Sequence, residues 1–288
     1  MRRLLLLSVV ACLVGALAWR YGAAISPFGA VTSQRPNPED TKVRNGTFTS
    51  AYFDLSYPLP PGWTEDMAGP GPSDSGYYVL GTFVPAGELT GAIFLAAQDM
   101  FFATRTAGDV AAAANDFRQA ISAIEGMTID REPAAVKVAD RLLQRVDFSG
   151  VGLYRAMFAA EIRCHLVSFN LTARDPEELA SLARSLDRLA FGSGQNAASS
   201  IPVCIKDYAA GDNLLQRVEP ESVGPTATPI PVRIIIGTDG AVKHVHVIRA
   251  TALQRRSIED ALRQWKLRPH EIDGRAVEVE TGLTFRFR

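Results

Sequence analysis

One short stretch, IIIGTDGAV at residues 234–242, decides how the second half of the chain folds. A β-branched run leads into it, Asp239-Gly240 is the residue pair that a two-residue hairpin turn favours, and Val242 begins the return. The stretch therefore predicts a hairpin of two strands, Ile230 to Gly237 and Val242 to Arg249.

A helix and a last strand follow this hairpin. Ile258, Ala261, Leu262 and Trp265 recur at helical spacing, and a helix over them would end before Pro269. After a second turn at Asp273-Gly274, apolar residues alternate in a strand that runs to the end of the chain: Val277, Val279, Leu283, Phe285 and Phe287. These elements predict a small sheet with one main helix.

Three motifs in this half resemble the TonB C-terminal domain family: IIIGTDGAV at 234–242, ALRQWKLRP at 261–269 and DGRAV at 273–277, after an entry segment Val218-Glu219-Pro220. The resemblance implies a domain over residues 206–288 whose sheet edge receives an extended segment of a protein partner. The N-terminal segment contains no His and the following spacer is short, so the resemblance implies reuse of this module rather than a complete energy transducer.

The last strand carries the predicted partner-binding residues, Thr284, Phe285, Arg286 and Phe287. The arginines beside the phenylalanines disfavour non-specific pairing of this strand with other chains, while its backbone can still accept a partner strand.

The first half predicts a second, larger sheet. Strands are expected at 52–57, 77–83, 91–99, 141–148, 153–161 and 163–171. An amphipathic helix is expected over 107–125, with Thr106 and Asp109 as its capping box, and a second helix begins at the N-cap Asp175 with Glu178 completing its box.

Residues 46–192 more faintly resemble the PsbP-like fold, an antiparallel sheet flanked by helices. The resemblance rests on the aromatic pair Tyr52-Phe53, the element LPPGW at 59–63 and the closing segment LDRLAF at 186–191. It implies an accessory or assembly role without chemistry. The predicted fold class is thus α+β in two domains. A linker at 25–45 leads from the N-terminal segment into the first domain, and a linker at 193–205 joins the two domains.

The N-terminus has the features of an export signal. Met1-Arg2-Arg3 is basic, Leu4 to Leu17 is apolar, and Ala16-Leu17-Ala18 offers a cleavage site, so residues 1–24 are expected to be a signal peptide or an N-terminal anchor. Cleavage is favoured because the apolar stretch is shorter than a comfortable membrane span. Lipidation at Cys12 is a lesser alternative. The protein is therefore expected in the periplasm, or anchored in the inner membrane and facing it.

Two cysteines remain beyond this segment, Cys164 and Cys204. In an oxidising compartment they are a candidate disulfide. The alternative, which the sequence favours slightly, is a pair of buried, unpaired thiols.

Composition excludes several classes of protein. The 288 residues are 47% hydrophobic and 21% charged, with a formal net charge of −1. This balance argues against a nucleic-acid binder, a disordered chain and a polytopic membrane protein.

No residue pattern supports catalysis or a cofactor. His244 and His246 alternate on a strand and are a weak metal-site candidate, but the favoured interpretation turns Val245 and Val247 to the core and both histidines to solvent. His165 is interpreted as a structural histidine rather than a general base. No nucleophile elbow is present.

The sequence therefore predicts a non-catalytic binding protein of the cell envelope, linked to envelope transport. The alternative is a periplasmic accessory protein that binds a small molecule or lipid in a pocket between the N-terminal sheet and the helix at 107–125.

Overall fold

The computed structural model describes residues 35–66, 69–88, 90–103, 109–192 and 201–287. Residues Pro36–Arg288 form one compact unit. The predicted signal segment at 1–24, Thr106 of the predicted capping box, and residues 193–200 of the second predicted linker lie outside the described residues.

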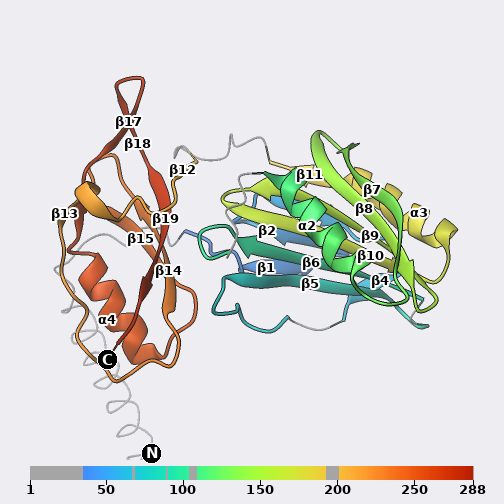
Figure 1. The fold of residues 1–288 in the computed structure, drawn as a ribbon, viewed down its shortest axis with the longest axis horizontal. Helices are drawn as coiled ribbons and strands as arrows, with labels where there is room; N and C mark the ends of the chain where they lie inside the picture. Colours follow the sequence, from blue (N-terminus) through green and yellow to red (C-terminus); the bar gives the residue numbers. More distant parts are fainter. Residues whose placement is uncertain (1–34, 67–68, 89, 104–108, 193–200, 288) are drawn as a thin grey trace, which may run out of the picture. The chain divides into compact units, whose positions relative to one another are not determined.

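A seven-stranded antiparallel sheet is the centre of the first domain (Figure 1). Its order is β4-β5-β6-β10-β9-β8-β7, with bounds Trp63–Glu65 (β4), Tyr77–Pro85 (β5), Gly91–Asp99 (β6), His165–Ala173 (β10), Leu153–Ile162 (β9), Arg141–Gly150 (β8) and Thr128–Val138 (β7). Strand β7 was not expected from the sequence because it is polar and contains Pro133. Proline removes a ladder donor and is tolerated at a sheet edge, which is where β7 lies.

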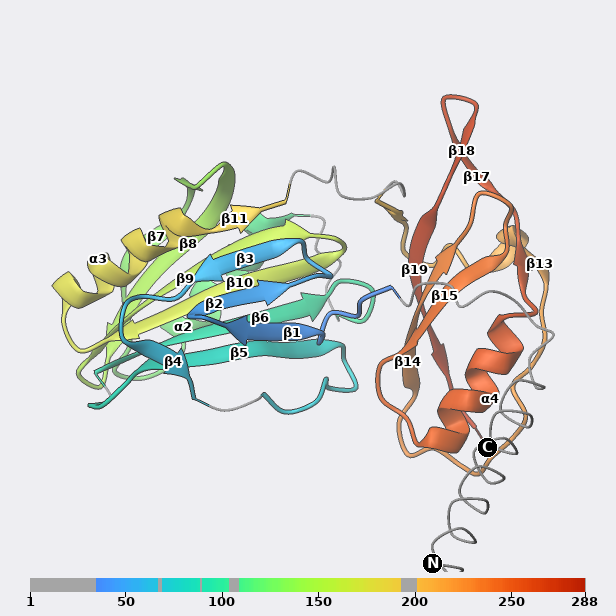
Figure 2. The ribbon, with the colours of Figure 1, turned by 180° about the vertical axis from the view of Figure 1, so that it is seen from behind.

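A smaller sheet covers one face of the large one (Figure 2). Its strands, in the order β1-β2-β3-β11, span Thr41–Arg44, Thr47–Ser50, Leu55–Pro58 and Ala190–Phe191. Helix α3 (Pro176–Ser185), followed by a 3-10 turn at Leu186–Arg188, packs on the same side. The side chains between these layers form the main core, for example Tyr57, Phe83, Phe169 and Leu182.

Helix α2 (Val110–Ser122) lies on the opposite face of the large sheet. Its buried residue Ala114 contacts a separate apolar cluster that includes Val146 and Met157. Asp109 is the N-cap, and its Oδ1 accepts hydrogen bonds from the Ala111 and Ala112 amides at 2.8 and 3.2 Å. Asp109 thus caps this helix itself, where the sequence placed it at the third helical position.

The second domain contains a four-stranded sheet with one helix on it. The order is β12-β19-β14-β15, with bounds Val203–Cys204, Val279–Phe285, Ile230–Ile236 and Val242–Val247. Helix α4 (Ala252–Leu262) packs its buried residues against one face, and Thr251 with Gln254 forms its capping box. The Asp-Gly hairpin between β14 and β15 is confirmed.

Short elements complete this domain. They are β13 (Leu214–Gln216), paired with β16 (Lys266–Leu267); β17 (His270–Ile272), paired with β18 (Arg275–Val277); and a 3-10 turn at Gly211–Asn213. In the β17–β18 turn, Asp273 and Gly274 have φ values of 52° and 73°. Both residues are in the left-handed region that such a turn requires.

The predicted α+β class is confirmed, and four local predictions need correction. Tyr52-Phe53 lies in a turn before β3 because Asp54 has a φ of 48°, which an extended strand does not allow. Thr41–Arg44 forms β1 although 25–45 was expected to be a linker, and β12 lies inside the linker expected at 193–205. The last strand ends at Phe285 rather than at the chain terminus.

Candidate functional site

The four residues predicted to bind a partner lie at the end of β19 and just beyond it, and they alternate between the core and solvent. Phe285 and Phe287 are each 7% exposed and belong to the core beneath α4. Thr284 and Arg286 are exposed. The aromatic pair therefore anchors the strand in the domain, and only Thr284 and Arg286 present side chains to solvent.

The two edges of β19 differ. One edge pairs along its whole length with β14, from Val279 opposite Ile236 to Phe285 opposite Ile230. The other edge pairs at Val279 and Glu280 with the parallel strand β12. Within the described part of the chain, no strand pairs with this second edge between Thr281 and Phe285.

Backbone direction along the open edge follows from the β12 contacts. The carbonyls of Glu278 and Glu280 accept hydrogen bonds from the Val203 and Ile205 amides at 2.8 and 3.1 Å. Because alternate residues of a strand direct their backbone groups to the same edge, Gly282 and Thr284 direct theirs to the open edge. Beyond the strand, the Phe287 carbonyl accepts from the amide of Thr226, in the segment that leads into β14, at 3.2 Å.

A disulfide joins β12 to the first domain. Cys204 of β12 is bonded to Cys164, with their Cα atoms 5.7 Å apart. Cys164 is 2% exposed and lies in the tight turn between β9 and β10, whereas Cys204 is exposed. The structure thus has the bridge rather than two free thiols.

The face of the second sheet turned away from α4 contributes to a buried charged cluster, which the sequence did not reveal. Arg233 of β14 is 2% exposed, and its guanidinium donates hydrogen bonds to Asp99 and, at 3.0 Å, to the Tyr52 hydroxyl. It also forms an ion pair with Glu280 Oε1 at 2.9 Å. The Phe101 ring lies 4.9 Å from the same guanidinium. Two carboxylates thus surround one buried cation.

Electrostatics keep this cation charged. Burial alone would lower the pKa of Arg233, but Tyr52, Asp99 and Glu280 outweigh it and raise that pKa well above its usual value. Buried ion pairs contribute little net stability compared with apolar packing, but removing one partner is costly because a charge is left uncompensated.

His165 lies beside this cluster and is fully buried. Its Nδ1 lies 2.7 Å from the Arg163 carbonyl and its Nε2 lies 3.8 Å from Asp99 Oδ2. Burial, and then the charge of Arg233, lower its pKa well below the usual value. His165, Cys164 and two carboxylates do meet here, as a catalytic site would require, but Cys164 is in the disulfide and every member is buried. The arrangement is that of a structural cluster.

This burial predicts how stability depends on pH. The unfolded chain binds a proton at His165 near pH 6.5, whereas folded His165 stays neutral well below that pH. The contribution of neutral His165 to the free energy of unfolding is therefore fully present above pH 6.5 and is lost as the pH falls below that value. Between pH 6 and 5, we expect the free energy of unfolding of the wild type to fall by about 1.4 kcal/mol per pH unit more than that of His165→Gln. Urea unfolding at each pH measures both values. Parallel stability curves for the two proteins would contradict this prediction.

His246 is buried, so the prediction that both histidines lie in solvent is wrong for it, whereas His244 is half-buried. His246 is 5% exposed, its Nε2 lies 2.9 Å from Glu39 Oε1, and its ring stacks on Tyr78. His244 Nε2 lies 3.3 Å from Asn37 Oδ1. Burial opposes ionisation of Glu39, but its hydrogen bond with His246 and the charge of His246 lower its pKa. Among the described residues, no group of three or more His, Cys, Asp or Glu side chains could hold a metal ion.

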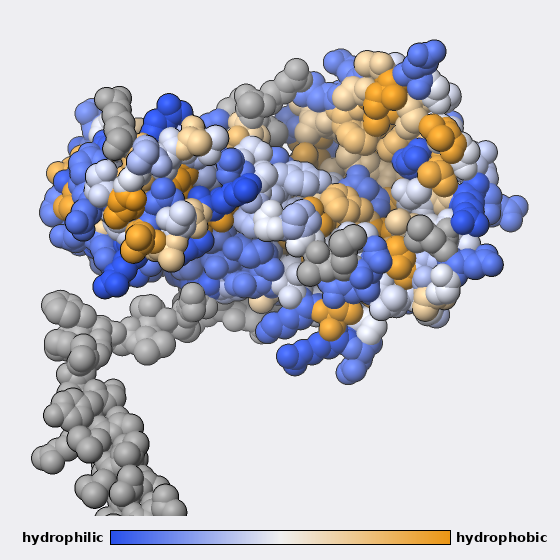
Figure 3. All heavy atoms as spheres, turned by 90° about the horizontal axis from the view of Figure 1, so that it is seen from below, coloured by the Kyte–Doolittle hydropathy of each residue, from blue (hydrophilic) through white to orange (hydrophobic). Residues whose placement is uncertain are grey.

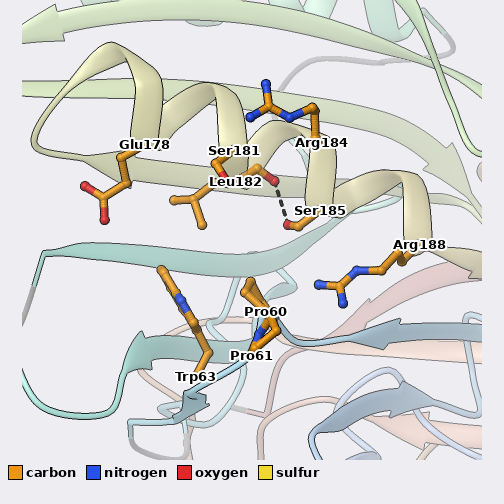
Figure 4. Close-up of a pocket in the computed structure, with 9 residues that line it drawn as sticks. All are labelled: Pro60, Pro61, Trp63, Glu178, Ser181, Leu182, Arg184, Ser185 and Arg188. Atoms are coloured by element: carbon orange, nitrogen blue, oxygen red, sulfur yellow. Dashed lines mark hydrogen bonds between the residues drawn. The ribbon is translucent and has the colours of Figure 1, made fainter.

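The structure contains a pocket of about 430 Å³ in the first domain, between α3 and the segment before β4 (Figure 4). Pro60, Pro61 and Trp63 line one side, and Arg188 points toward the prolines from the other. This position differs from the pocket expected beside the helix at 107–125. At α2, Val146 and Met157 fill the contact with the sheet.

The surface and helices give two further observations. Apolar residues interrupt a largely hydrophilic surface on the face shown in Figure 3. The most exposed large apolar side chains of the described residues include Leu142, Val151 and Leu253.

Over that same part of the chain, no helix is long and apolar enough to cross a membrane.

Comparison with protein-family models matches residues 229–288 to the C-terminal region of the Gram-negative bacterial TonB protein. The predicted resemblance of the second domain is thereby confirmed over those residues.

Solved structures similar to the chain include cyanobacterial PsbP from Synechocystis, at 12% identity and a TM-score of 0.38, covering 58% of this chain and 100% of that one. LpqN, described as involved in cell envelope biogenesis of Mycobacterium tuberculosis, matches at 13% identity and a TM-score of 0.30, covering 46% and 78%. The Ran-binding protein Mog1p of Saccharomyces cerevisiae matches at 10% identity and a TM-score of 0.31, covering 48% and 90%. A search of curated proteins gave no match.

Proposed function

We propose that this chain is an exported, non-catalytic binding protein of the cell envelope, whose second domain takes an extended segment of a partner protein onto β19. The observation that supports this most directly is the edge of β19, where the described residues pair on the β12 side only at Val279 and Glu280. Unpaired backbone donors and acceptors at a sheet edge are the groups that an added strand binds.

The rest of the second domain suits this role. The Phe285 and Phe287 side chains fix β19 in the core, so a partner would meet a strand that is already ordered. Binding to an ordered strand avoids part of the entropy cost of association. Exposed Arg286 beside the edge would favour a partner segment with an acidic residue at the matching position.

Thr284→Pro tests the proposal because Thr284 directs its N–H to the open edge and not to β14. Proline removes that donor and leaves the β14 ladder intact. In the full-length protein crosslinked in its native envelope, we expect recovery of the specific partner to fall by about tenfold, the loss from one or two backbone hydrogen bonds. Recovery is measured by mass spectrometry of the crosslinked species.

Thr284→Val is the matched control because valine keeps the N–H and the branched shape of threonine. We expect it to recover the partner as the wild type does, and we expect both variants to melt within a few degrees of the wild type. Undiminished recovery with folded Thr284→Pro would contradict strand addition at this edge.

A further inference from the structure

The chain already places a strand of its own on the edge of β19. Strand β12 runs parallel to β19 and uses the carbonyls of Glu278 and Glu280 as acceptors. A partner strand that pairs with the same edge has two choices: it stops short of Glu280, or it displaces β12. While β12 is in place, Gly282 and Thr284 are the described residues of β19 whose backbone groups face a partner at this edge.

The disulfide and a short set of contacts hold β12: the Val203 and Ile205 amides donate to β19, and farther along the chain the Tyr208 amide donates to Thr281 Oγ1 at 3.2 Å. The strand is two residues long, whereas most strands have five or six. Ile201 before it is 61% exposed and Cys204 is exposed, although Pro202 is buried and Ile205 packs against the second core. The Cys164 end of the bridge is fixed, since Cys164 is 2% exposed and its carbonyl accepts from the Met100 amide at 3.0 Å.

We propose that the Cys164–Cys204 disulfide controls how much of the β19 edge a partner strand can use. This inference rests on the proposed function and adds its regulation. With the bridge intact, β12 covers the first part of the edge. With the bridge reduced, β12 leaves, and the backbone groups of Glu278 and Glu280 join those of Gly282 and Thr284 in one continuous edge. The number of edge residues offered to a partner doubles from two to four.

The chemistry is thiol–disulfide exchange with a protein or small-molecule dithiol as reductant. A thiolate of the dithiol attacks Sγ of exposed Cys204, the S–S bond breaks, and Cys164 leaves as a thiolate that takes up a proton. The second thiol of the reductant then attacks the mixed disulfide and releases Cys204 as a thiol. Two electrons and two protons pass to the chain, and the dithiol is oxidised to its disulfide.

Hydrogen exchange of the full-length protein measures the release directly. Oxidised protein, protein reduced with dithiothreitol and Cys204→Ser are compared by mass spectrometry. We expect the amides of Val203 and Ile205, which donate to β19, to exchange at least tenfold faster in the second and third samples. Amides of β14, such as Ile234, serve as the internal control and should keep their rates. Unchanged exchange at Val203 and Ile205 would overturn the proposal.

The affinity for a peptide shows whether the edge of β19 has opened. The probe is a fluorescent synthetic peptide of residues 201–207 with Ser in place of Cys204, the sequence that β19 already accepts. We expect it to bind reduced protein and Cys204→Ser at least tenfold more tightly than oxidised protein. Val203→Pro, which removes one donor of β12 and keeps the bridge, should also bind it more tightly than the oxidised wild type.

The two readouts separate this proposal from the proposed function. Equal peptide binding to oxidised and reduced protein, with unchanged amides, would overturn the redox control and leave strand addition standing. Faster exchange of the β12 amides with no peptide binding to any form would overturn the control as well, and would show that the edge does not accept a strand.

Discussion

Arg233→Met is expected to lower the free energy of unfolding by about 3–5 kcal/mol, because it leaves Asp99 and Glu280 buried without their cation. Methionine keeps most of the length and apolar volume of the arginine stem, so the loss comes from the charge rather than from a cavity. Both carboxylates are at most 3% exposed and cannot be rehydrated without opening the structure. Urea unfolding at pH 7 measures the loss.

Two controls make the Arg233 result specific. Arg256→Met removes an arginine whose side chain is 84% exposed and whose nearest acid, Asp260, lies 3.8 Å away, so we expect a change within about 0.5 kcal/mol. Combining Arg233→Met with Glu280→Gln removes one uncompensated charge, so we expect the double variant to be more stable than the sum of the single losses predicts. Additive losses, or a single loss below about 1 kcal/mol, would show that the cluster carries little of the stability.

Arg233 also shows what could and could not be predicted from the sequence. The strand was predictable because Ile230 to Ile236 is almost wholly apolar, and the lone arginine within it is itself a sign of a buried charge. Its partners were not predictable, since Asp99 and Tyr52 lie 134 and 181 residues away. Contacts at such separation depend on tertiary packing, which a local pattern does not encode.

The histidines of β15 illustrate the same limit. Alternation correctly assigns Val245 and Val247 to the side of α4. It assigns His244 and His246 only to the opposite face, and the assumption that this face is solvated was wrong because Glu39 and Tyr78 cover His246. Strand β12 was missed for a simpler reason, since a two-residue strand has no periodicity to detect.

Trp265→Ala is the second change with a large expected effect. Trp265 is 3% exposed in the core between α4 and the sheet, its Nε1 donates to the Val218 carbonyl at 2.8 Å, and its ring lies 6.1 Å from that of Phe285. Alanine removes this packing and leaves the Val218 carbonyl without its donor. We therefore expect the free energy of unfolding to fall by about 3–5 kcal/mol. Urea unfolding, followed by far-UV circular dichroism, measures it.

Trp63→Ala is the matched control, since Trp63 is only partly buried and packs at the rim of the first core. We expect Trp63→Ala to lower the free energy of unfolding by less than half as much as Trp265→Ala does. A larger loss from Trp63→Ala than from Trp265→Ala would contradict this ranking.

Trp265→Ala also shows why stability must be measured beside partner capture. Trp265 packs on Phe285 of the strand that offers the edge, so this variant is expected to lose the partner together with the fold of its domain. Thr284→Pro is expected to lose the partner while the domain stays folded, because its missing donor faces the open edge. Loss of partner capture is therefore evidence for strand addition only in a variant that stays folded, such as Thr284→Pro. If both variants lost the partner and were equally destabilised, the edge of β19 would have a structural role only.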